Sequence, residues 1–251
     1  MPFPHSIAPA RSYRTGTRPR TGECAFQVVV EETDLHIVAS RPLPDEALAA
    51  VRGLRSRLKA FILCRPDFGR SLEPVDVPKA SHPVIRAMAE AARCCNVGPM
   101  AAVAGGMAEH VARALAPLSS EVLVENGGDT YLISTKDRTI ALLADPAREA
   151  SLGVRISAGE FPVSLCASSA TYGHSLSLGR GDLVVARSRS GVFADAAATA
   201  LCNELKAEAD VEKVLEAAQG LARGEGPRLE GVFVQCGQKM GAWGKMELAL
   251  L

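Results

Sequence analysis

The chain has 251 residues, enough to bury a sizeable core, with 28 basic against 28 acidic residues and only 4% aromatic residues. The balanced charge and the scarcity of aromatic rings argue against nucleic acid or an anionic membrane as the partner, since these need basic or stacking surfaces. Seven cysteines without metal-ligand spacing, including the adjacent Cys94 and Cys95, indicate reduced core thiols. The chain also has no apolar run long enough to span a bilayer. Together with the reduced thiols, this leads us to expect a soluble cytoplasmic protein.

Residues 1–22 are rich in Pro, Arg, Ser and Thr, and we expect an N-terminal arm there, followed by a single domain over 23–251. Two β-rich runs at 26–31 and 35–39 predict a hairpin. Apolar residues at helical spacing predict helices over 45–64 and 83–95, the second with Ser81 as its N-cap. A Pro-rich connection at 66–78 separates these helices.

A helix of small residues over 100–115 contains two adjacent glycines, Gly105 and Gly106. Together they cost a helix about 2 kcal/mol relative to alanines, at about 1 per glycine. Such glycines let another backbone or a ligand approach closely. The sequence leaves both explanations open.

A strand at 121–125 leads into Asn126-Gly127-Gly128-Asp129, and a second strand follows at 130–133. On its own this tetrapeptide is typical of a hairpin or a bulge. The flanking strands are apolar, as central strands are, and a bulge between them would aim polar groups at one point. The glycine N–H groups would then be available to an anion or a nucleotide.

Further strands are predicted at 139–143, 152–156, 161–166 and 182–186, with a helix over 210–223 and a closing hairpin of 231–235 with 245–250. Between the strands at 161–166 and 182–186, residues 167–179 form a polar stretch with six hydroxyl-bearing residues and His174. Runs of strands with helices on one side predict an α+β fold with a mainly antiparallel sheet.

A helix over 192–203 carries Asp195 and Thr199, which lie four residues apart and therefore on one face. A carboxylate and a hydroxyl placed this way suit Mg²⁺, which takes oxygen ligands and shares them with substrate phosphates. A simpler explanation is that Asp195 favours the helix dipole and Thr199 bonds back to a carbonyl one turn earlier.

Four segments in this order, at 102–108, 125–129, 167–174 and 194–200, resemble the ApbE-like flavin transferase family, in particular a short cytoplasmic branch of it. The resemblance implies a T-fold-like domain that binds FAD and is compatible with a homo-oligomer. It implies Mg²⁺ on Asp195, Thr199 and a backbone carbonyl near Ala104. In such transferases FMN passes to a hydroxyl of an acceptor protein, unidentified here, and AMP leaves.

The resemblance also assigns His174 as the general base that takes the acceptor proton. The remaining implied nucleotide-binding residues are Gly105, Gly106, Asn126, Gly127, Gly128, Asp129, Ser168 and Ser169.

The sequence departs from the transferases in ways that weaken transfer more than binding. Gly105 replaces their lysine, Ala170 replaces the glycine of their Ser-Ser-Gly loop, and the segment after the family histidine differs. We also expect no lipoprotein leader. The alternative is therefore a flavin- or nucleotide-binding protein without catalysis. A hydrolase using Ser168, Ser169 or Cys166 with His174 is a third reading, and no nucleophile-elbow motif supports it.

Overall fold

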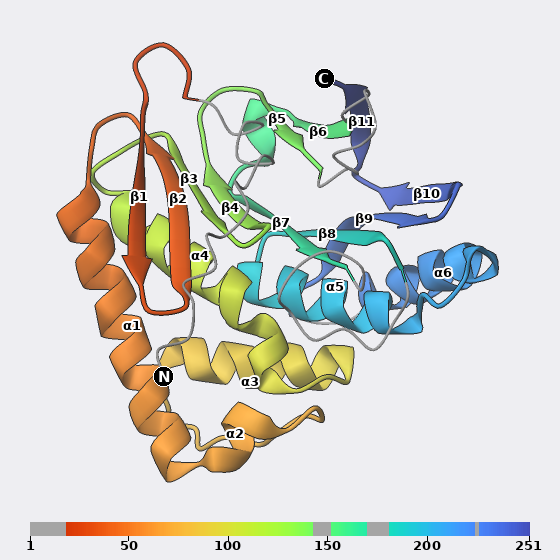
Figure 1. Ribbon diagram of the computed structural model, residues 1–251, viewed down its shortest axis with the longest axis horizontal. Helices are drawn as coiled ribbons and strands as arrows, with labels where there is room; N and C mark the ends of the chain where they lie inside the picture. Colours follow the sequence, from red (N-terminus) through yellow and green to blue (C-terminus); the bar gives the residue numbers. More distant parts are fainter. Residues whose placement is uncertain (1–18, 143–151, 170–180, 224–225) are drawn as a thin grey trace, which may run out of the picture.

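The described residues form a layer of helices, a large sheet and a small sheet (Figure 1). The computed structural model describes residues 19–142, 152–169, 181–223 and 226–251. The large sheet has eight strands in the order β1-β2-β3-β4-β7-β8-β9-β10, and all neighbours run antiparallel. These strands are β1 (Cys24–Val30), β2 (Thr33–Ala39), β3 (Val122–Asn126), β4 (Asp129–Ile133), β7 (Val163–Ser168), β8 (Leu183–Ser188), β9 (Leu229–Cys236) and β10 (Lys239–Gly244).

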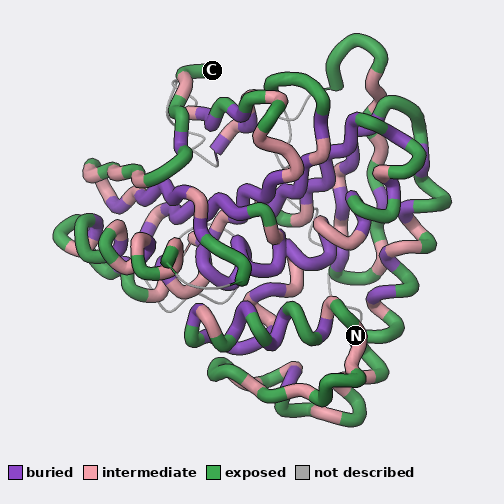
Figure 2. The backbone as a smooth tube through the Cα atoms, turned by 180° about the vertical axis from the view of Figure 1, so that it is seen from behind, coloured by how far each residue is buried: buried purple, intermediate pink, exposed green. Residues whose placement is uncertain are grey.

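The helices lie on one side of this sheet, where α1, α4, α5 and α6 pack against its strands and α2 and α3 pack against other helices, and the main core lies on this side (Figures 1 and 2). They are α1 (Pro44–Cys64), α2 (Pro66–Arg70), α3 (Pro83–Cys95), α4 (Val103–Leu115), α5 (Gly191–Glu204) and α6 (Val211–Leu221). The apolar spacing that predicted α1 buries Ala47, Val51, Leu54 and Leu58 against the core. None of the helices in the described ranges combines the length and apolar character needed to cross a bilayer.

A small sheet covers part of the opposite face of the large sheet (Figure 1). Its order is β11-β6-β5, formed by β5 (Arg138–Ala141), β6 (Leu152–Ile156) and β11 (Glu247–Leu250). A second apolar core lies between the two sheets and includes Leu123, Val154, Ile156 and Phe233. The predicted α+β fold with a mainly antiparallel sheet and helices on one side is confirmed, and the small sheet is an addition that the sequence did not indicate.

The predicted closing hairpin of 231–235 with 245–250 is wrong. β9 pairs with β10 instead, and β11 crosses to the small sheet, where it pairs with β6. Gly244 permits this change of direction because its φ is +75°, a left-handed conformation that favours glycine. Alternating apolar residues had identified 245–250 as a strand, but alternation does not specify a strand's partner.

Two local predictions on the helical side also need correction. The Pro-rich connection contains the short helix α2, which begins at Pro66, where proline is well tolerated in a first turn. The N-cap of α3 is His82 rather than Ser81, and its Nδ1 accepts a hydrogen bond from the backbone N–H of Val84 at 3.4 Å.

The cysteines are all free, as predicted, but they are not all core residues. Cys95 is buried and Cys94 is half-buried, whereas Cys64 is exposed at the end of α1. Burial raises the pKa of Cys95 to about 12, so this thiol stays protonated. Burial and the charge of Glu90, which accepts a hydrogen bond from the Cys94 Sγ at 3.7 Å, also raise the pKa of Cys94, so neither thiol is activated.

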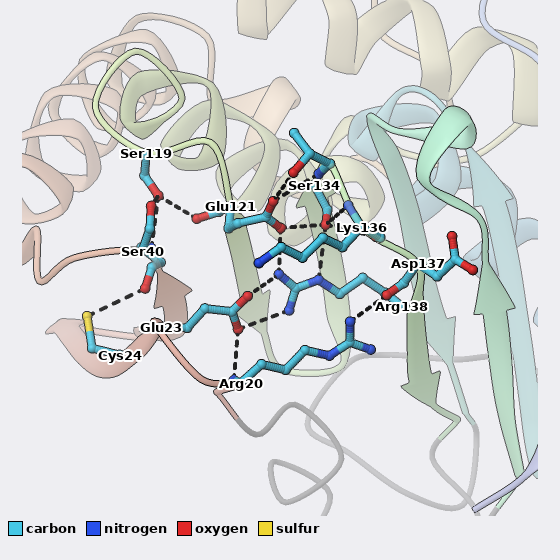
Figure 3. Close-up of polar contacts among 12 residues, drawn as sticks. Arg20, Glu23, Cys24, Ser40, Ser119, Glu121, Ser134, Lys136, Asp137 and Arg138 are labelled. Atoms are coloured by element: carbon cyan, nitrogen blue, oxygen red, sulfur yellow. Dashed lines mark hydrogen bonds and ion pairs between the residues drawn. The ribbon is translucent and has the colours of Figure 1, made fainter.

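A buried ion-pair network joins the small sheet to the edge of the large one (Figure 3). The guanidinium of Arg138, on β5, binds the carboxylate of Glu23 and that of Glu121, the latter at 2.7 Å, and its Nε donates to the Ser134 hydroxyl at 3.1 Å. Although burial raises the pKa of Glu121, hydrogen bonds from Ser134, Thr135 and Arg138 lower it to about 2. The network therefore holds two carboxylates ionised in the interior.

Candidate functional site

The first turns of α4 and α5 touch through two glycines. A Cβ placed on Gly105 would lie 2.3 Å from the carbonyl oxygen of Gly191, and one on Gly191 would lie 2.5 Å from the carbonyl oxygen of Gly105. A Cβ placed on Gly106 would lie 3.2 Å from the Cγ2 of the Val192 side chain. Of the two explanations for the glycine pair, close helix packing therefore accounts for both positions. It also leaves no space for a side chain at Gly105, where the resemblance in sequence implied a lysine in the transferase family.

Asp195 projects from α5 onto the beginning of α4. Its carboxylate is buried, and Oδ2 accepts a hydrogen bond from the backbone N–H of Gly105 at 2.8 Å. The side-chain amide of Asn126 donates to the carbonyl of Ala104 at 3.1 Å. The structure thus brings together Ala104, Gly105, Asn126 and Asp195, which come from three distant parts of the chain. Thr199 lies one turn further along α5 and is half-buried.

A second buried carboxylate, that of Asp129, lies at the start of β4 within electrostatic reach of Asp195. Its Oδ1 accepts a hydrogen bond from the backbone N–H of Ala167 at 3.1 Å. Burial raises the pKa of Asp129, and the nearby charge of Glu125 adds to this. Burial and the charge of Asp129 likewise raise the pKa of Asp195, against the lowering effect of the Gly105 and Ala104 N–H groups. The two carboxylates repel each other, and a cation between them would relieve that repulsion.

Of the hairpin and the bulge that the sequence left open for Asn126-Gly-Gly-Asp129, the structure forms the hairpin turn. Asn126 pairs with Asp129 across the turn, and both glycines have positive φ, +68° at Gly127 and +108° at Gly128. Such a two-residue turn needs left-handed conformations at both central positions. The Gly128 N–H donates to Oε1 of Glu125 at 2.9 Å, so an anion would have to displace that bond. Even so, the hairpin does direct Asn126 and Asp129 toward the helices.

The polar stretch after β7 falls largely outside the described residues. Ser168 is buried at the end of β7, the strand next to β4, and Ser169, the residue after this strand, is half-buried. His174, the predicted base, and Ala170 lie in the undescribed range 170–180. The proposed roles of His174 and of the two serines therefore stay predictions.

Two further residues adjoin this site: Cys166, which the sequence offered only as a hydrolase nucleophile, and Glu109, which sequence reasoning missed. Cys166 is fully buried between the carboxylates, and burial together with the charges of Asp129 and Asp195 raises the pKa of its thiol well above the ordinary value. Such a thiol is a poor nucleophile, which weakens the hydrolase reading that used it. Glu109, four residues after Gly105, binds the start of α5. Its helical spacing from Gly105 was the available signal.

Donor chemistry at the site fits a hard cation. The Asp195 carboxylate and the Ala104 carbonyl, which lie together, and the Thr199 hydroxyl, which the resemblance adds, are of the oxygen type that Mg²⁺ takes, and the remaining positions would go to water or phosphate. Throughout the described ranges, no three His, Cys, Asp or Glu side chains gather to hold a metal by themselves. A metal here would therefore depend on backbone and ligand oxygens.

Replacing Asp129 by asparagine is expected to stabilise the ligand-free protein by at least about 1 kcal/mol at pH 8. Burial raises the pKa of Asp129 from 3.8 to about 7 in the folded state, so the folded protein binds this proton more tightly than the unfolded chain. Ionising Asp129 in the folded protein therefore lowers the free energy of unfolding. This loss is absent below pH 3.8, grows as pH rises to about 7 and then levels off. Urea unfolding of both proteins at pH 4.5 and pH 8 measures it. A variant less stable than wild type at pH 8 would contradict the raised pKa of Asp129.

The fold, an antiparallel sheet with helices on one side, is shared with solved ApbE proteins. A solved flavinyl transferase ApbE from Pseudomonas stutzeri aligns with a TM-score of 0.58 and 13% identity, covering 88% of this chain and 93% of that one. The flavin transferase ApbE from Vibrio cholerae aligns with a TM-score of 0.56 and 13% identity, covering 88% and 96%. At this identity the likeness shows the fold.

The sequence comparisons place the chain within this superfamily. Residues 17–247 match the family described as AbpE bacteria, and the chain belongs to that family. A UPF0280 protein of Methanocaldococcus jannaschii is 34% identical over 224 residues, covering 88% of this chain and 90% of its own length. The recognition of an ApbE-like protein from four short motifs is thereby confirmed.

Proposed function

We propose that this protein is a Mg²⁺-dependent enzyme that acts on FAD and releases AMP, either by transferring FMN to an acceptor protein or by hydrolysing the pyrophosphate. The observation that carries the proposal is the placement of the Asp195 carboxylate at the Ala104–Gly105 start of α4, beside a second buried carboxylate. The flavin transferases that share the fold support the choice of substrate.

In this proposal the chain supplies the geometry. Ala104, Asp195 and Thr199 would hold Mg²⁺, and Asn126 would orient the Ala104 carbonyl through its amide. When bound, Mg²⁺ neutralises charge that develops on a pyrophosphate oxygen. An acceptor hydroxyl or a water forms a bond to the FMN phosphorus, the bond to the AMP phosphate breaks, and His174 takes the proton.

A flavin-binding protein without catalysis is the second candidate, and one observation favours it. The contact between Gly105 and Gly191 leaves no space for the lysine of the transferases, so α4 offers no side-chain cation to the pyrophosphate at that position. Binding would then rest on the metal alone.

The test is a titration of the protein with FAD, with and without Mg²⁺, following bound flavin and released AMP together. AMP release should require Mg²⁺ and fall by at least about 100-fold in Asp195→Asn. Asp137→Asn is the matched control, because Asp137 also accepts a backbone hydrogen bond, from Ala158 at 3.0 Å, beside the small sheet. FAD binding without AMP would select the second candidate, and no binding would contradict both.

A further inference from the structure

Two helices each place a carboxylate on the first turn of the other. Asp195 of α5 accepts from the Gly105 N–H at the start of α4, at 2.8 Å. Conversely, Glu109 of α4 accepts from the Gly191 N–H at the start of α5, at 2.7 Å, and lies 3.5 Å from the Ser190 hydroxyl. The first N–H groups of a helix have no partner within it and carry partial positive charge, so both carboxylates are favourably placed.

Glu109 is itself held in position by neighbours on α4 and β4. The Nε of Arg113 donates to Oε1 of Glu109 at 2.8 Å, and the Arg113 guanidinium lies over the Tyr131 ring, 5.4 Å from its centroid. The hydroxyl of Tyr131 donates to the carbonyl of Arg189 at 3.3 Å, just before α5 begins. These contacts form a closed path from α4 through β4 to the entry of α5.

We infer that Glu109 is a positioning residue for the Asp195 carboxylate. Asp195 follows Gly191 by four residues, about one turn, so whatever fixes Gly191 also fixes the direction in which Asp195 points. The glycine contact brings the two helices close together but offers no directional bond, and Glu109 supplies that bond. The inference rests on the proposed function only in treating Asp195 as a metal ligand.

The side-chain chemistry of Glu109 suggests three variants. Glu109→Ala removes its contacts with Gly191, Ser190 and Arg113. Glu109→Gln keeps an oxygen that accepts from Gly191 and loses the ion pair with Arg113. Glu90→Ala is the matched control, since Glu90 also pairs with an arginine of its own helix, Arg93 at 2.5 Å, without reaching α5.

The first measurement is amide hydrogen exchange, which needs no ligand. In Glu109→Ala the Gly105 amide should exchange about tenfold faster, because its acceptor, Asp195, is displaced, while the Val111 amide within α4 should not. Glu109→Gln should give a smaller change and Glu90→Ala none. Equal acceleration of all amides in α4 and α5, or an unchanged Gly105 amide, would overturn the inference.

The second measurement is a Mn²⁺ titration followed by electron paramagnetic resonance on the same folded proteins. Residues that orient a metal ligand contribute about 10- to 100-fold in affinity, so Glu109→Ala should weaken Mn²⁺ binding by about tenfold, with partial rescue in Glu109→Gln. Failure of the wild-type protein to bind Mn²⁺ would count against the proposed function, and hydrogen exchange at Gly105 would still decide the role of Glu109. Wild-type affinity in Glu109→Ala would overturn the inference.

Discussion

Replacing Gly105 by alanine is expected to destabilise the protein by about 3 kcal/mol or more, or to prevent it from folding. The added methyl group would lie 2.3 Å from the Gly191 carbonyl oxygen, 2.8 Å from the Asp195 Cβ and 3.0 Å from the Cys166 sulfur. The Gly191 oxygen is backbone and the Asp195 Cβ is the stem of a side chain, so neither of these two atoms moves without shifting α5. Urea unfolding at neutral pH measures the loss.

The control for this variant is Gly53→Ala, in the exposed middle of α1. An added methyl group there has no heavy atom within 4 Å, so only helix propensity changes. We expect a gain of roughly 0.5–1 kcal/mol. If Gly105→Ala matched Gly53→Ala, the α4–α5 contact would be looser than described. Gly105→Lys should fail for the same steric reason.

Replacing Arg138 by methionine is expected to cost about 3–5 kcal/mol, because it leaves the carboxylates of Glu23 and Glu121 buried without their cation. The control is Arg155→Met, which removes an exposed pair with Asp137 at 3.4 Å and should change stability by less than about 1 kcal/mol. Equal effects of the two substitutions would contradict a buried network.

The same network makes stability depend on pH in a defined direction. The folded pKa of Glu121, about 2, lies below its ordinary value of 4.5. Its contribution is therefore fully present above about pH 4.5 and is lost as pH falls toward 2. Unfolding measured between pH 5 and pH 2.5 should show this loss in the wild-type protein and a smaller slope in Arg138→Met. An unchanged slope would show that Arg138 does not set the pKa of Glu121.

Local patterns predicted most of the elements but not how they are assembled. Helices α1 and α3 followed from apolar spacing, and the β1–β2 hairpin from two β-rich runs around a polar turn. Pairing of β2 with β3 joins Leu35 to Asn126, and nothing local in either strand specifies that partner. The predicted partner of residues 245–250 was wrong for the same reason, since β11 pairs with β6.

The candidate site shows the same division between local and long-range information. Asp195 and Asn126 were identified by motif, and the structure places each against the start of α4. The raised pKa of Asp129 was not predictable, because it arises from burial and from charges brought near only by folding. The contact between Gly105 and Gly191 was predictable only in part. The glycine pair in α4 indicated that something approaches closely, but it did not indicate that α5 does so.

The bond between Asp195 and the Gly105 amide joins residues that are 90 positions apart, so its two ends meet only in the native chain. A compound that binds there has no counterpart site in the unfolded protein. By mass action it must therefore raise the melting temperature, with a stabilisation of about 2.7 kcal/mol at a hundred times its dissociation constant. Thermal melting can thus rank nucleotides and divalent cations as ligands before any reaction is known.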